Sequence, residues 1–285
     1  MPELPEVETI TRALRNGGRN EPSILGKTVK NAQVYWKRTL AQPSAPAFTK
    51  RILGQRITDV RRRGKFVIIQ FQTQFLLFHL RMSGDLKVEA RYDLDGQEVP
   101  AKKHDRLILD FTDGMRLAFT DTRKFGRAWL VMDPQAILAD LGPEPLDPTL
   151  TQSVFYKMLN SRSRQLKPLL LDQKFLAGLG NIYTDEALHL AKLHPRTNSR
   201  HITSAQTKIL LKSIRSVLRE GIKRNGASID WVYRGGGFQN HFSVYQCTGE
   251  PCPVCGTPIQ RMVIGQRSTH FCPVCQSEPK KQESE

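Results

Sequence analysis

The chain has 285 residues, with 43 lysines and arginines against 27 aspartates and glutamates, so its formal charge is +16 at neutral pH. A polycation of this kind binds polyanions by releasing their counterions, which makes nucleic acid the first candidate partner and an anionic membrane surface the alternative. No apolar run approaches the roughly 20 residues needed to span a bilayer, and the start of the chain lacks the layout of a signal peptide, so we expect no membrane span and a cytosolic or nucleoid location.

A short helix is predicted at the start of the chain. Apolar residues recur at helical spacing from Val7 to Leu14, Pro5 suits the first helical position, and a pair of glycines at 17 and 18 ends the pattern. Residues 1–4 would then form a free arm ahead of the helix. The helix dipole is a sufficient reason for Glu8 in the first turn, and an alternative reason for Glu6.

The residues ahead of this helix offer a chemistry of their own. Met1 is normally removed when proline follows, and Pro2 would then carry a free secondary amine. An α-amino group titrates near ~8, so part of it is neutral and nucleophilic at physiological pH. Its attack on an aldehyde or a sugar C1′ gives a cationic iminium, which makes elimination of a β-phosphate feasible. Glu3 beside it is a candidate general acid and base.

Residues 27–132 have the pattern of β-strands. The runs FVIIQF, FLLFHL, LILDF and MRLAF are short and rich in residues that favour β-strands. They are too continuously apolar for strands with one solvent-exposed face, which favours strands covered on both faces, as in a sandwich. A hairpin turn is predicted at 112–114. The basic residues Arg61, Arg62, Arg63 and Lys65 precede the first run and would ordinarily be a solvated strand end.

A proline-rich stretch at 134–148 marks a boundary, and the segments beyond it have helical periodicity. They are FYKML, FLAGLGNIYTDEALHLAKL and SAQTKILLKSIRSVLREGI. In the second, glycines and Asn181 place backbone N–H groups where they can bind phosphate, although a glycine-punctuated helix corner explains the same pattern. This region predicts a helical second domain.

All five cysteines lie near the end of the chain. Cys252-x2-Cys255 and Cys272-x2-Cys275 are separated by sixteen residues, a spacing typical of one tetrahedral, structural zinc ion held by four thiolates. Two disulfides are the alternative, which the absence of a secretion signal disfavours. The metal would supply stability that so short a module cannot draw from apolar burial. Cys247 is left without a role.

These motifs occur together and in order. MPELPEVET, GKF, HLRMSG, DTRKFG, LGPEPL, AGLGNIYTDEAL and the paired C-x2-C run from Pro2 to Cys275 and resemble the bacterial formamidopyrimidine-DNA glycosylases. The resemblance implies a bifunctional base-excision repair enzyme that removes 8-oxoguanine and formamidopyrimidines from double-stranded DNA, then cleaves the strand at the abasic site by β,δ-elimination. It also implies an α+β, multidomain fold: an N-terminal β-sandwich, a helix-two-turn-helix domain and a zinc finger.

The resemblance also assigns roles in the chemistry. Pro2 is similar to the family's nucleophile and Glu3 to its acid and base. Lys65 in GKF resembles the cation beside the lesion phosphate. Asn181 and Arg267 resemble the two groups that hold the same phosphate region from the other domain.

Four further residues match positions that contact DNA in the family. His79 is similar to a contact with the DNA backbone. Met82, Arg123 and Phe125 resemble the three residues that fill the gap left by the everted nucleotide, which lowers an unstacking cost of a few kcal/mol. From the residues alone, Met82 and Phe125 would be assigned to the core.

The expected domains follow from the resemblance: residues 1–133 form the catalytic sandwich, 134–152 a linker, 153–240 the helical DNA-binding domain, 241–276 the zinc finger and 277–285 a disordered tail. We expect a monomer. An insertion at 91–103 should be a surface loop, and residues 222–238 should contain the loop that reads the everted base.

Other assignments remain open. Arg261 and His270, like Arg267, lie on the strands of the finger and would face either phosphate or solvent. Leu4 matches the oxidised-purine branch, whereas the related endonuclease VIII branch, which prefers oxidised pyrimidines, typically has glycine there. A DNA-binding protein without catalytic activity is a further alternative, against which the presence of both Pro2 and Glu3 argues.

Overall fold

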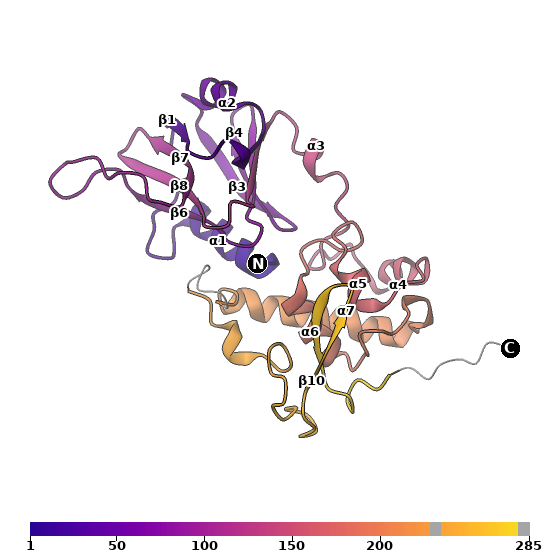
Figure 1. Cartoon of the computed structure of the whole chain (residues 1–285). Helices are drawn as coiled ribbons and strands as arrows, with labels where there is room; N and C mark the ends of the chain where they lie inside the picture. Colours follow the sequence, from indigo (N-terminus) through magenta and orange to yellow (C-terminus); the bar gives the residue numbers. More distant parts are fainter. Residues whose placement is uncertain (229–234, 279–285) are drawn as a thin grey trace. The chain divides into compact units, whose positions relative to one another are not determined.

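The computed structural model describes residues 1–228 and 235–278 (Figure 1). The chain divides into two compact units. The first, which we call the sandwich unit, comprises Met1–Ala139 and Asn225–Gly236, and the second, the helical unit, comprises Asp140–Arg224 and Gly237–Glu285. Predictions for 279–285, and for 229–234 in the base-reading segment, lie outside the described residues.

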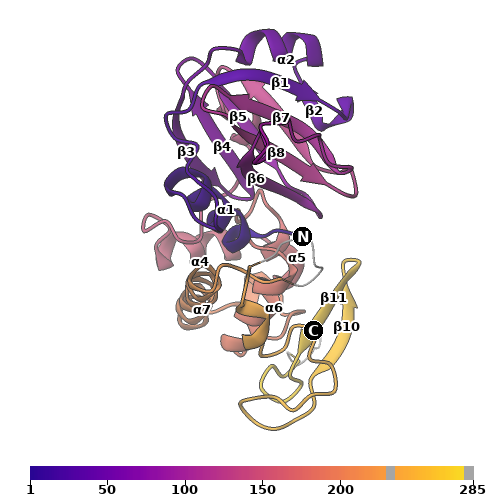
Figure 2. The ribbon, with the colours of Figure 1, turned by 90° about the vertical axis from the view of Figure 1, so that its left-hand side faces the viewer.

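Within the described residues, two sheets form the sandwich unit (Figure 2). One has four strands in the order β1-β7-β8-β6 and the other five in the order β2-β9-β5-β4-β3. Neighbouring strands are antiparallel except for β2 beside β9. The strands are β1 (Val29–Val34), β2 (Leu40–Gln42), β3 (Ile57–Arg63), β4 (Phe66–Phe71), β5 (Phe75–His79), β6 (Gly84–Ala90), β7 (Asp105–Phe111), β8 (Met115–Asp121) and β9 (Arg127–Val131).

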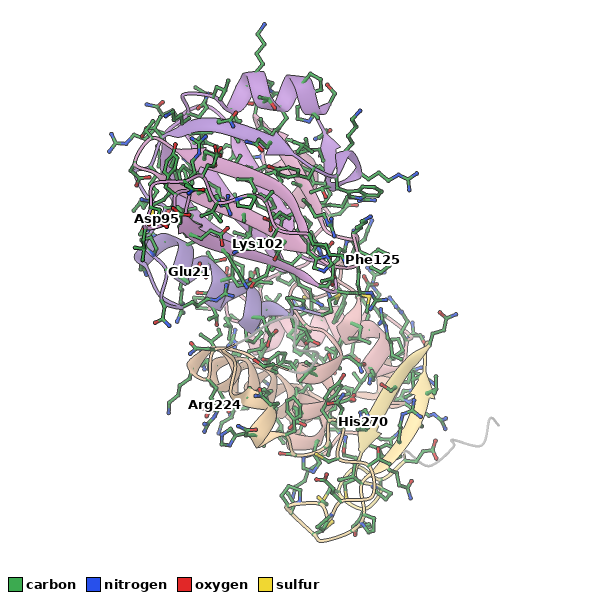
Figure 3. The ribbon with its side chains drawn as sticks, turned by 60° about the vertical axis from the view of Figure 1, so that its left-hand side comes forward. Glu21, Asp95, Lys102, Phe125, Arg224 and His270 are labelled. Atoms are coloured by element: carbon green, nitrogen blue, oxygen red, sulfur yellow. The ribbon has the colours of Figure 1, made fainter. Side chains whose placement is uncertain are left out.

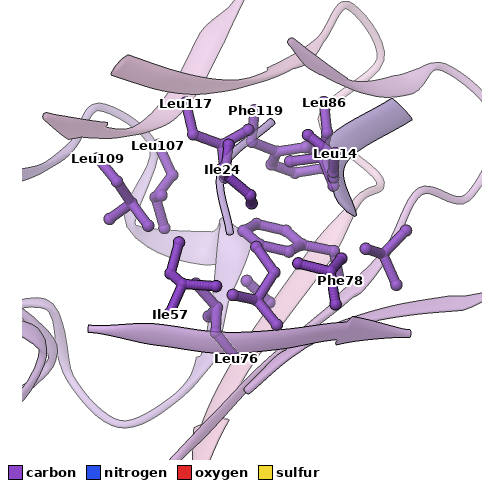
Figure 4. Close-up of a cluster of buried hydrophobic side chains, with 14 of the residues drawn as sticks. Leu14, Ile24, Ile57, Leu76, Phe78, Leu86, Leu107, Leu109, Leu117 and Phe119 are labelled. Atoms are coloured by element: carbon purple, nitrogen blue, oxygen red, sulfur yellow. The ribbon is translucent and has the colours of Figure 1, made fainter. Parts of the chain in front are cut away.

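The core lies between the two sheets and confirms the predicted sandwich. Every residue of β7 is buried, as its continuous apolar run predicts. Figure 4 shows Leu117 and Phe119 of the four-stranded sheet facing Leu76 and Phe78 of the other. The rings of Phe78 and Phe119 lie 5.1 Å apart between centroids. Burying each such side chain contributes roughly 1.5–3 kcal/mol, so these contacts hold the sheets together.

Among its described residues, the sandwich unit has the helices α1 (Leu4–Asn16), α2 (Ala45–Ile52) and α3 (Gln135–Leu138), with a 3-10 turn η1 (Lys37–Thr39). The predicted N-terminal helix is confirmed, but the free arm is wrong. Pro2, Glu3 and Leu4 are all buried, Leu4 completely. An apolar side chain at this position gains more free energy from burial than an extended arm would keep in conformational entropy.

The helical unit confirms the three predicted helical segments. It contains α4 (Gln152–Asn160), α5 (Leu166–Leu171), α6 (Asn181–Leu190) and α7 (Ser204–Lys223), the 3-10 turns η2 (Ser199–His201) and η3 (Phe238–His241), and a hairpin of β10 (Gln260–Ile264) and β11 (Arg267–Phe271).

None of the helices in the described part of the chain has the length and apolar character needed to cross a bilayer.

The insertion at 91–103 is a surface loop, as predicted. Leu94 at its tip is fully exposed, and a single bridge between Tyr92 and Glu98 closes its base. The loop connects β6 to β7, and none of the candidate site residues lies in it.

Candidate functional site

The N terminus of α1 is built around Glu6. The backbone N–H of Glu3, the residue ahead of the helix, donates to Glu6 Oε2 at 2.8 Å, and the backbone N–H of Ala227 donates to Glu6 Oε1 at 2.7 Å. A Cβ added at Gly226 would lie 2.6 Å from Glu6 Oε1, so only glycine fits there. Glu6 therefore does more than favour the helix dipole: it fastens residues 226–227 to the helix start beside Pro2.

Glu8 is also more than a dipole residue. Its carboxylate accepts from Arg12 Nε at 2.7 Å and from Arg62 Nε at 2.8 Å. Burial opposes its ionisation, but the hydrogen bonds and charges of Arg62 and Arg12 outweigh burial and lower the pKa of Glu8. The ion pair with Arg62 joins α1 to β3 and fixes the helix that Pro2 and Glu3 directly precede.

The basic run 61–65 is a solvated strand end only in part, because Arg61 is exposed whereas Lys65 is buried. Arg62 is paired with Glu8, and the guanidinium of Arg61 lies 5.6 Å from the centroid of the Phe75 ring. Lys65 is only 5% exposed, in the tight turn between β3 and β4 that Gly64 makes at φ 55°. A lysine held this deep is placed for a specific contact rather than for solubility.

His79 ends β5 on the strand beside Lys65. It pairs across the sheet with Phe66, the residue after Lys65, and the two rings meet edge to face at 4.8 Å. Burial, followed by the charges of Arg81 and Lys65, lowers the pKa of His79 to about 3. Nδ1 accepts the backbone N–H of Arg81 at 3.1 Å, so the neutral ring carries its hydrogen on Nε2. His79 can thus donate to an anion without being charged.

Two large apolar side chains are exposed at one end of the sandwich. Met82 lies between β5 and β6 and is 37% exposed, and Phe125 lies between β8 and β9 and is 49% exposed (Figure 3). The guanidinium of Arg123 lies 5.1 Å from the centroid of the Phe125 ring. Neither Met82 nor Phe125 belongs to the core, so the prediction of core residues from residue type alone is wrong. The gap-filling role that the family pattern implies stays a prediction.

In the helical unit, Asn181 lies near Arg267 because its side chain is hydrogen-bonded to the backbone of the next residue, Ser268. Asn181 is the first residue of α6, and its Nδ2 donates to the backbone oxygen of Ser268 at 2.9 Å. Arg267 precedes Ser268 at the start of β11 and is exposed. Asn181 Oδ1 is buried and has no hydrogen-bond partner within the described residues. A phosphate offers only acceptor oxygens, so the group of Asn181 that can bind one is the second N–H of its Nδ2.

The sequence did not predict a buried ion pair that binds the same Ser268 carbonyl. The Lys167 ammonium donates to Asp185 Oδ1 at 2.6 Å and to the Ser268 carbonyl at 2.7 Å, and both side chains are fully buried. Asp185 Oδ2 also accepts the backbone N–H of His270 at 3.0 Å. His270 is 4% exposed, so it faces neither phosphate nor solvent. The sequence signal that could have predicted this ion pair is the presence of charged residues inside the apolar runs LKPLLL and NIYTDEAL, because a buried charge needs a partner.

The four predicted metal ligands meet in space. The sulfur atoms of Cys252, Cys255, Cys272 and Cys275 all lie within 4.8 Å of one another, which fits one tetrahedral zinc ion. His189 Nε2 on α6 lies 3.4 Å from Cys252 Sγ, a contact that ties the site to the helix. Four thiolates leave no open position, so a metal here is structural.

Cys247 lies outside this group. It is half-buried against the small apolar cluster that contains Val244 and Ile259. Burial, followed by the nearby charge of Glu250, raises the pKa of its thiol to about 11. Cys247 is therefore a packing residue with an unreactive thiol.

Three family models cover most of the chain. The formamidopyrimidine-DNA glycosylase N-terminal domain matches residues 1–128, the H2TH domain of the same glycosylase matches 141–232, and the zinc finger found in FPG and IleRS matches 249–277. A formamidopyrimidine-DNA glycosylase of Protochlamydia amoebophila is 42% identical over 97% of this chain and 99% of its own. The chain belongs to the formamidopyrimidine-DNA glycosylase family. Another member, from Latilactobacillus sakei, is 41% identical over 97% of this chain and 98% of its own.

Solved structures of formamidopyrimidine-DNA glycosylases share the fold. MutM in complex with DNA containing carbocyclic 8-oxo-G has a TM-score of 0.86 at 35% identity, and covers 97% of this chain and 100% of its own. A Lactococcus lactis FPG mutant with Fapy-dG DNA has a TM-score of 0.87 at 36% identity and the same coverage. The predicted α+β fold with a sandwich, a helical domain and a zinc finger is confirmed.

The residues that the glycosylase pattern singles out fall into two sets. The sandwich unit holds those expected at the lesion, namely Pro2, Glu3, Lys65, His79, Met82, Arg123 and Phe125. The helical unit holds Asn181, Arg267 and the four metal ligands. Within each unit, loops and element ends present these side chains, which is where a rigid scaffold ordinarily carries function.

Proposed function

We propose that this protein is a bifunctional DNA glycosylase and abasic-site lyase that excises 8-oxoguanine and formamidopyrimidines from double-stranded DNA. The observation that carries the proposal is the joint placement of Pro2 and Glu3 at the buried, Glu6-capped start of α1, in a chain of this family. Solved relatives are complexes with DNA that contains 8-oxo-G, Fapy-dG or an AP site.

The proposed chemistry begins at the Pro2 amine once Met1 has been removed. Its nitrogen attacks C1′ of the damaged nucleotide, the glycosidic bond breaks, and the base leaves with the bonding electrons and the proton of the amine. Glu3 gives its own proton to the sugar ring oxygen, which opens the ring to a cationic iminium. Loss of the C2′ proton expels the 3′ phosphate, and loss of the C4′ proton expels the 5′ phosphate. Water then hydrolyses the iminium and restores Pro2.

Each unit contributes its own contacts to DNA phosphates: Lys65 and His79 in the sandwich unit, and Asn181 and Arg267 in the helical unit. The buried ammonium of Lys65 supplies charge, whereas the neutral His79 ring supplies an Nε2–H donor. Asn181 contributes the second N–H of its Nδ2 at the N terminus of α6, where backbone N–H groups also favour an anion.

Phosphate contacts carry no sequence information, so their loss should weaken all duplexes alike. Lys65→Ala, Asn181→Ala and Arg267→Ala are each expected to raise the Kd for damaged and undamaged DNA by about 10-fold. The salt dependence should become shallower by ~0.9 for Lys65 and Arg267 and stay unchanged for Asn181. Fluorescence anisotropy across a salt series measures both. The exposed Lys208 on α7 is the matched control, and an unchanged slope in both charged variants would contradict these contacts.

Met82, Arg123 and Phe125 are proposed to fill the stack when the damaged nucleotide turns out. Phe125→Ala and Met82→Ala should each slow excision of 8-oxoguanine by about 10-fold, since unstacking costs a few kcal/mol per step. A preformed abasic site has no base to extrude, so its cleavage should stay nearly unchanged. Single-turnover gel assays on the two substrates test this. An equal loss on both would assign these side chains a structural role instead.

Lesion choice separates this proposal from its nearest alternative. On duplex with 8-oxoguanine opposite cytosine, the protein should show a higher kcat/KM than on duplex with thymine glycol. The reverse order would assign it to the endonuclease VIII-like branch. Binding without cleavage of either duplex would make it a DNA-binding protein that lacks the chemistry.

The remaining assignments belong to the same proposal. We expect a cytoplasmic, nucleoid-associated bacterial protein, supported by its net charge and its bacterial relatives, that acts as a monomer. The catalytic sandwich should span 1–133, the linker 134–152, the DNA-binding helices 153–240 and the finger 241–276.

A further inference from the structure

Asp121, at the end of β8, is buried at the base of both exposed loops. Its side chain is 1% exposed, and its oxygens accept hydrogen bonds from the residues that follow it. Oδ1 accepts the backbone N–H of Arg123 at 3.1 Å, and Oδ2 accepts the backbone N–H of Gly126 at 2.7 Å. The carboxylate therefore closes the loop 122–126, which carries Arg123 and Phe125, from the inside.

The same carboxylate also binds the loop that carries Met82. Ser83 Oγ donates to Asp121 Oδ1, and Ser83 Oγ in turn accepts the backbone N–H of Arg123 at 3.1 Å. In the ladder between β6 and β8, Gly84 is paired with Asp121, so the two loops leave the sheet side by side. One buried side chain is thus hydrogen-bonded to both loops.

Both loops pack closely against the residues beneath them at a glycine. A Cβ at Gly126 would lie 2.4 Å from Phe119 Cζ, and a Cβ at Gly84 would lie 2.6 Å from the Leu80 carbonyl and 2.9 Å from Phe119 Cε2. Phe119 is fully buried, so both loops rest on one fixed ring. Lys124, at φ 60°, places its ammonium 4.2 Å from the centroid of the Trp36 ring and braces the outer side.

Such bracing has a physical reason. Apolar burial does not hold Met82 and Phe125, because both are exposed, and an exposed aromatic ring tends to collapse onto the nearest apolar surface. Hydrogen bonds from the backbone to the buried Asp121 side chain hold the loops without covering Met82 and Phe125. The three side chains are then presented before any DNA arrives.

We propose that Asp121 is a positioning residue that joins the two loops into one platform, so that Met82, Arg123 and Phe125 enter the base stack together. This inference rests on the gap-filling role proposed above. Asp121 does not touch the reacting atoms, and it acts on base extrusion only. Its loss should therefore slow the excision of a base and spare the cleavage of a site that has none.

Asp121→Asn keeps the size of the side chain but places an NH2 group against backbone donors. We expect single-turnover excision of 8-oxoguanine to fall by about 10- to 100-fold, because a shift of about 1 Å in a positioned group is enough for such a loss. Cleavage of a preformed abasic site should change by less than about threefold. Ser83→Ala removes the link between the loops but leaves the Asp121 bonds to the backbone, so it should give a smaller loss of excision in the same direction.

The matched control is Asp110→Asn. Asp110 on β7 is 2% exposed, accepts a hydrogen bond from Asn31 Nδ2 at 3.1 Å, and lies opposite Arg116 in the strand ladder, at the other end of β8 from both loops. Its replacement should lower Tm about as much as Asp121→Asn while both rates stay unchanged. In the Asp121→Asn background, Phe125→Ala should cost much less than it does alone, because the platform is already lost.

The outcomes separate this inference from its premise. Slowed excision with intact abasic-site cleavage, together with a reduced effect of the second substitution, supports the platform. If Phe125→Ala slows excision but Asp121→Asn does not, the role of Asp121 is overturned alone. Parallel loss of both activities in Asp121→Asn would make it a stabilising residue. If Phe125→Ala leaves excision unchanged, the gap-filling role falls and the platform falls with it.

Discussion

Protein that retains Met1 is expected to bind lesion-containing duplex normally and to give no excision, no β,δ-elimination and no borohydride-trapped adduct. With Met1 in place, the Pro2 nitrogen is a tertiary amide whose lone pair is delocalised into the carbonyl. The new terminal amine lies about one residue, ~3.8 Å, away, and a displacement of only ~1 Å can cost a hundredfold. Mass spectrometry of the N terminus, followed by gel assays of both forms, measures this.

Glu3→Gln provides the comparison for the Met1-retained form. It keeps the Pro2 amine but removes the acid, so it should bind normally, lose base excision and still nick preformed abasic sites, where the aldehyde is already present. The buried backbone of Glu3 donates to Glu6 in either case, so the start of α1 should remain in place. If the Met1-retained form were as active as the processed one, the nucleophile would lie elsewhere in the chain.

Removal of the metal is expected to lower DNA affinity by at least about 100-fold. Within the described residues, the buried apolar cluster beneath the finger consists of Val244, Ile259, Cys252 and Cys272, too little to hold the module without a metal. Zinc bound by such sites contributes about 10–16 kcal/mol toward folding. Its loss should release β10 and β11 and with them Arg267. Anisotropy after chelation, with the metal content verified, measures the effect.

Two variants sharpen the zinc test. Cys272→Ser removes a fully buried ligand and should not recover when zinc is added back, whereas chelated wild-type protein should. Cys247→Ser is the matched control, because Cys247 packs against the same cluster but lies outside the ligand group, and it should keep both zinc and affinity. Undiminished affinity in a verified zinc-free sample would contradict this account of the finger.

The elements that the sequence predicts well are those set by local pattern. β4 and β7 read as continuous apolar runs because both of their faces are covered, and α7 reads as a helix because its apolar residues recur at helical spacing. The zinc site follows from spacing alone, since two residues between paired cysteines suit a knuckle whatever the surrounding fold.

What the sequence misses depends on contacts between distant segments. Glu6 resembles an ordinary first-turn acid until Ala227, more than two hundred residues away, is found to donate to it. Lys167 carries no motif, and only the structure pairs it with Asp185 and Ser268. Asp121 lies in the motif DTRKFG, in which Arg123 and Phe125 match a family role and Asp121 has none assigned. In the structure, Asp121 is the residue that is hydrogen-bonded to both loops.

The most direct test of the central claim is to locate the covalent bond. Processed protein is incubated with duplex containing 8-oxoguanine opposite cytosine in the presence of borohydride, the trapped complex is digested, and the peptide that carries the sugar remnant is sequenced by mass spectrometry. A modification on the nitrogen of an N-terminal Pro2 is the predicted result. A modification on a lysine, Lys65 included, or the absence of any trapped complex from protein that excises the base, would contradict it.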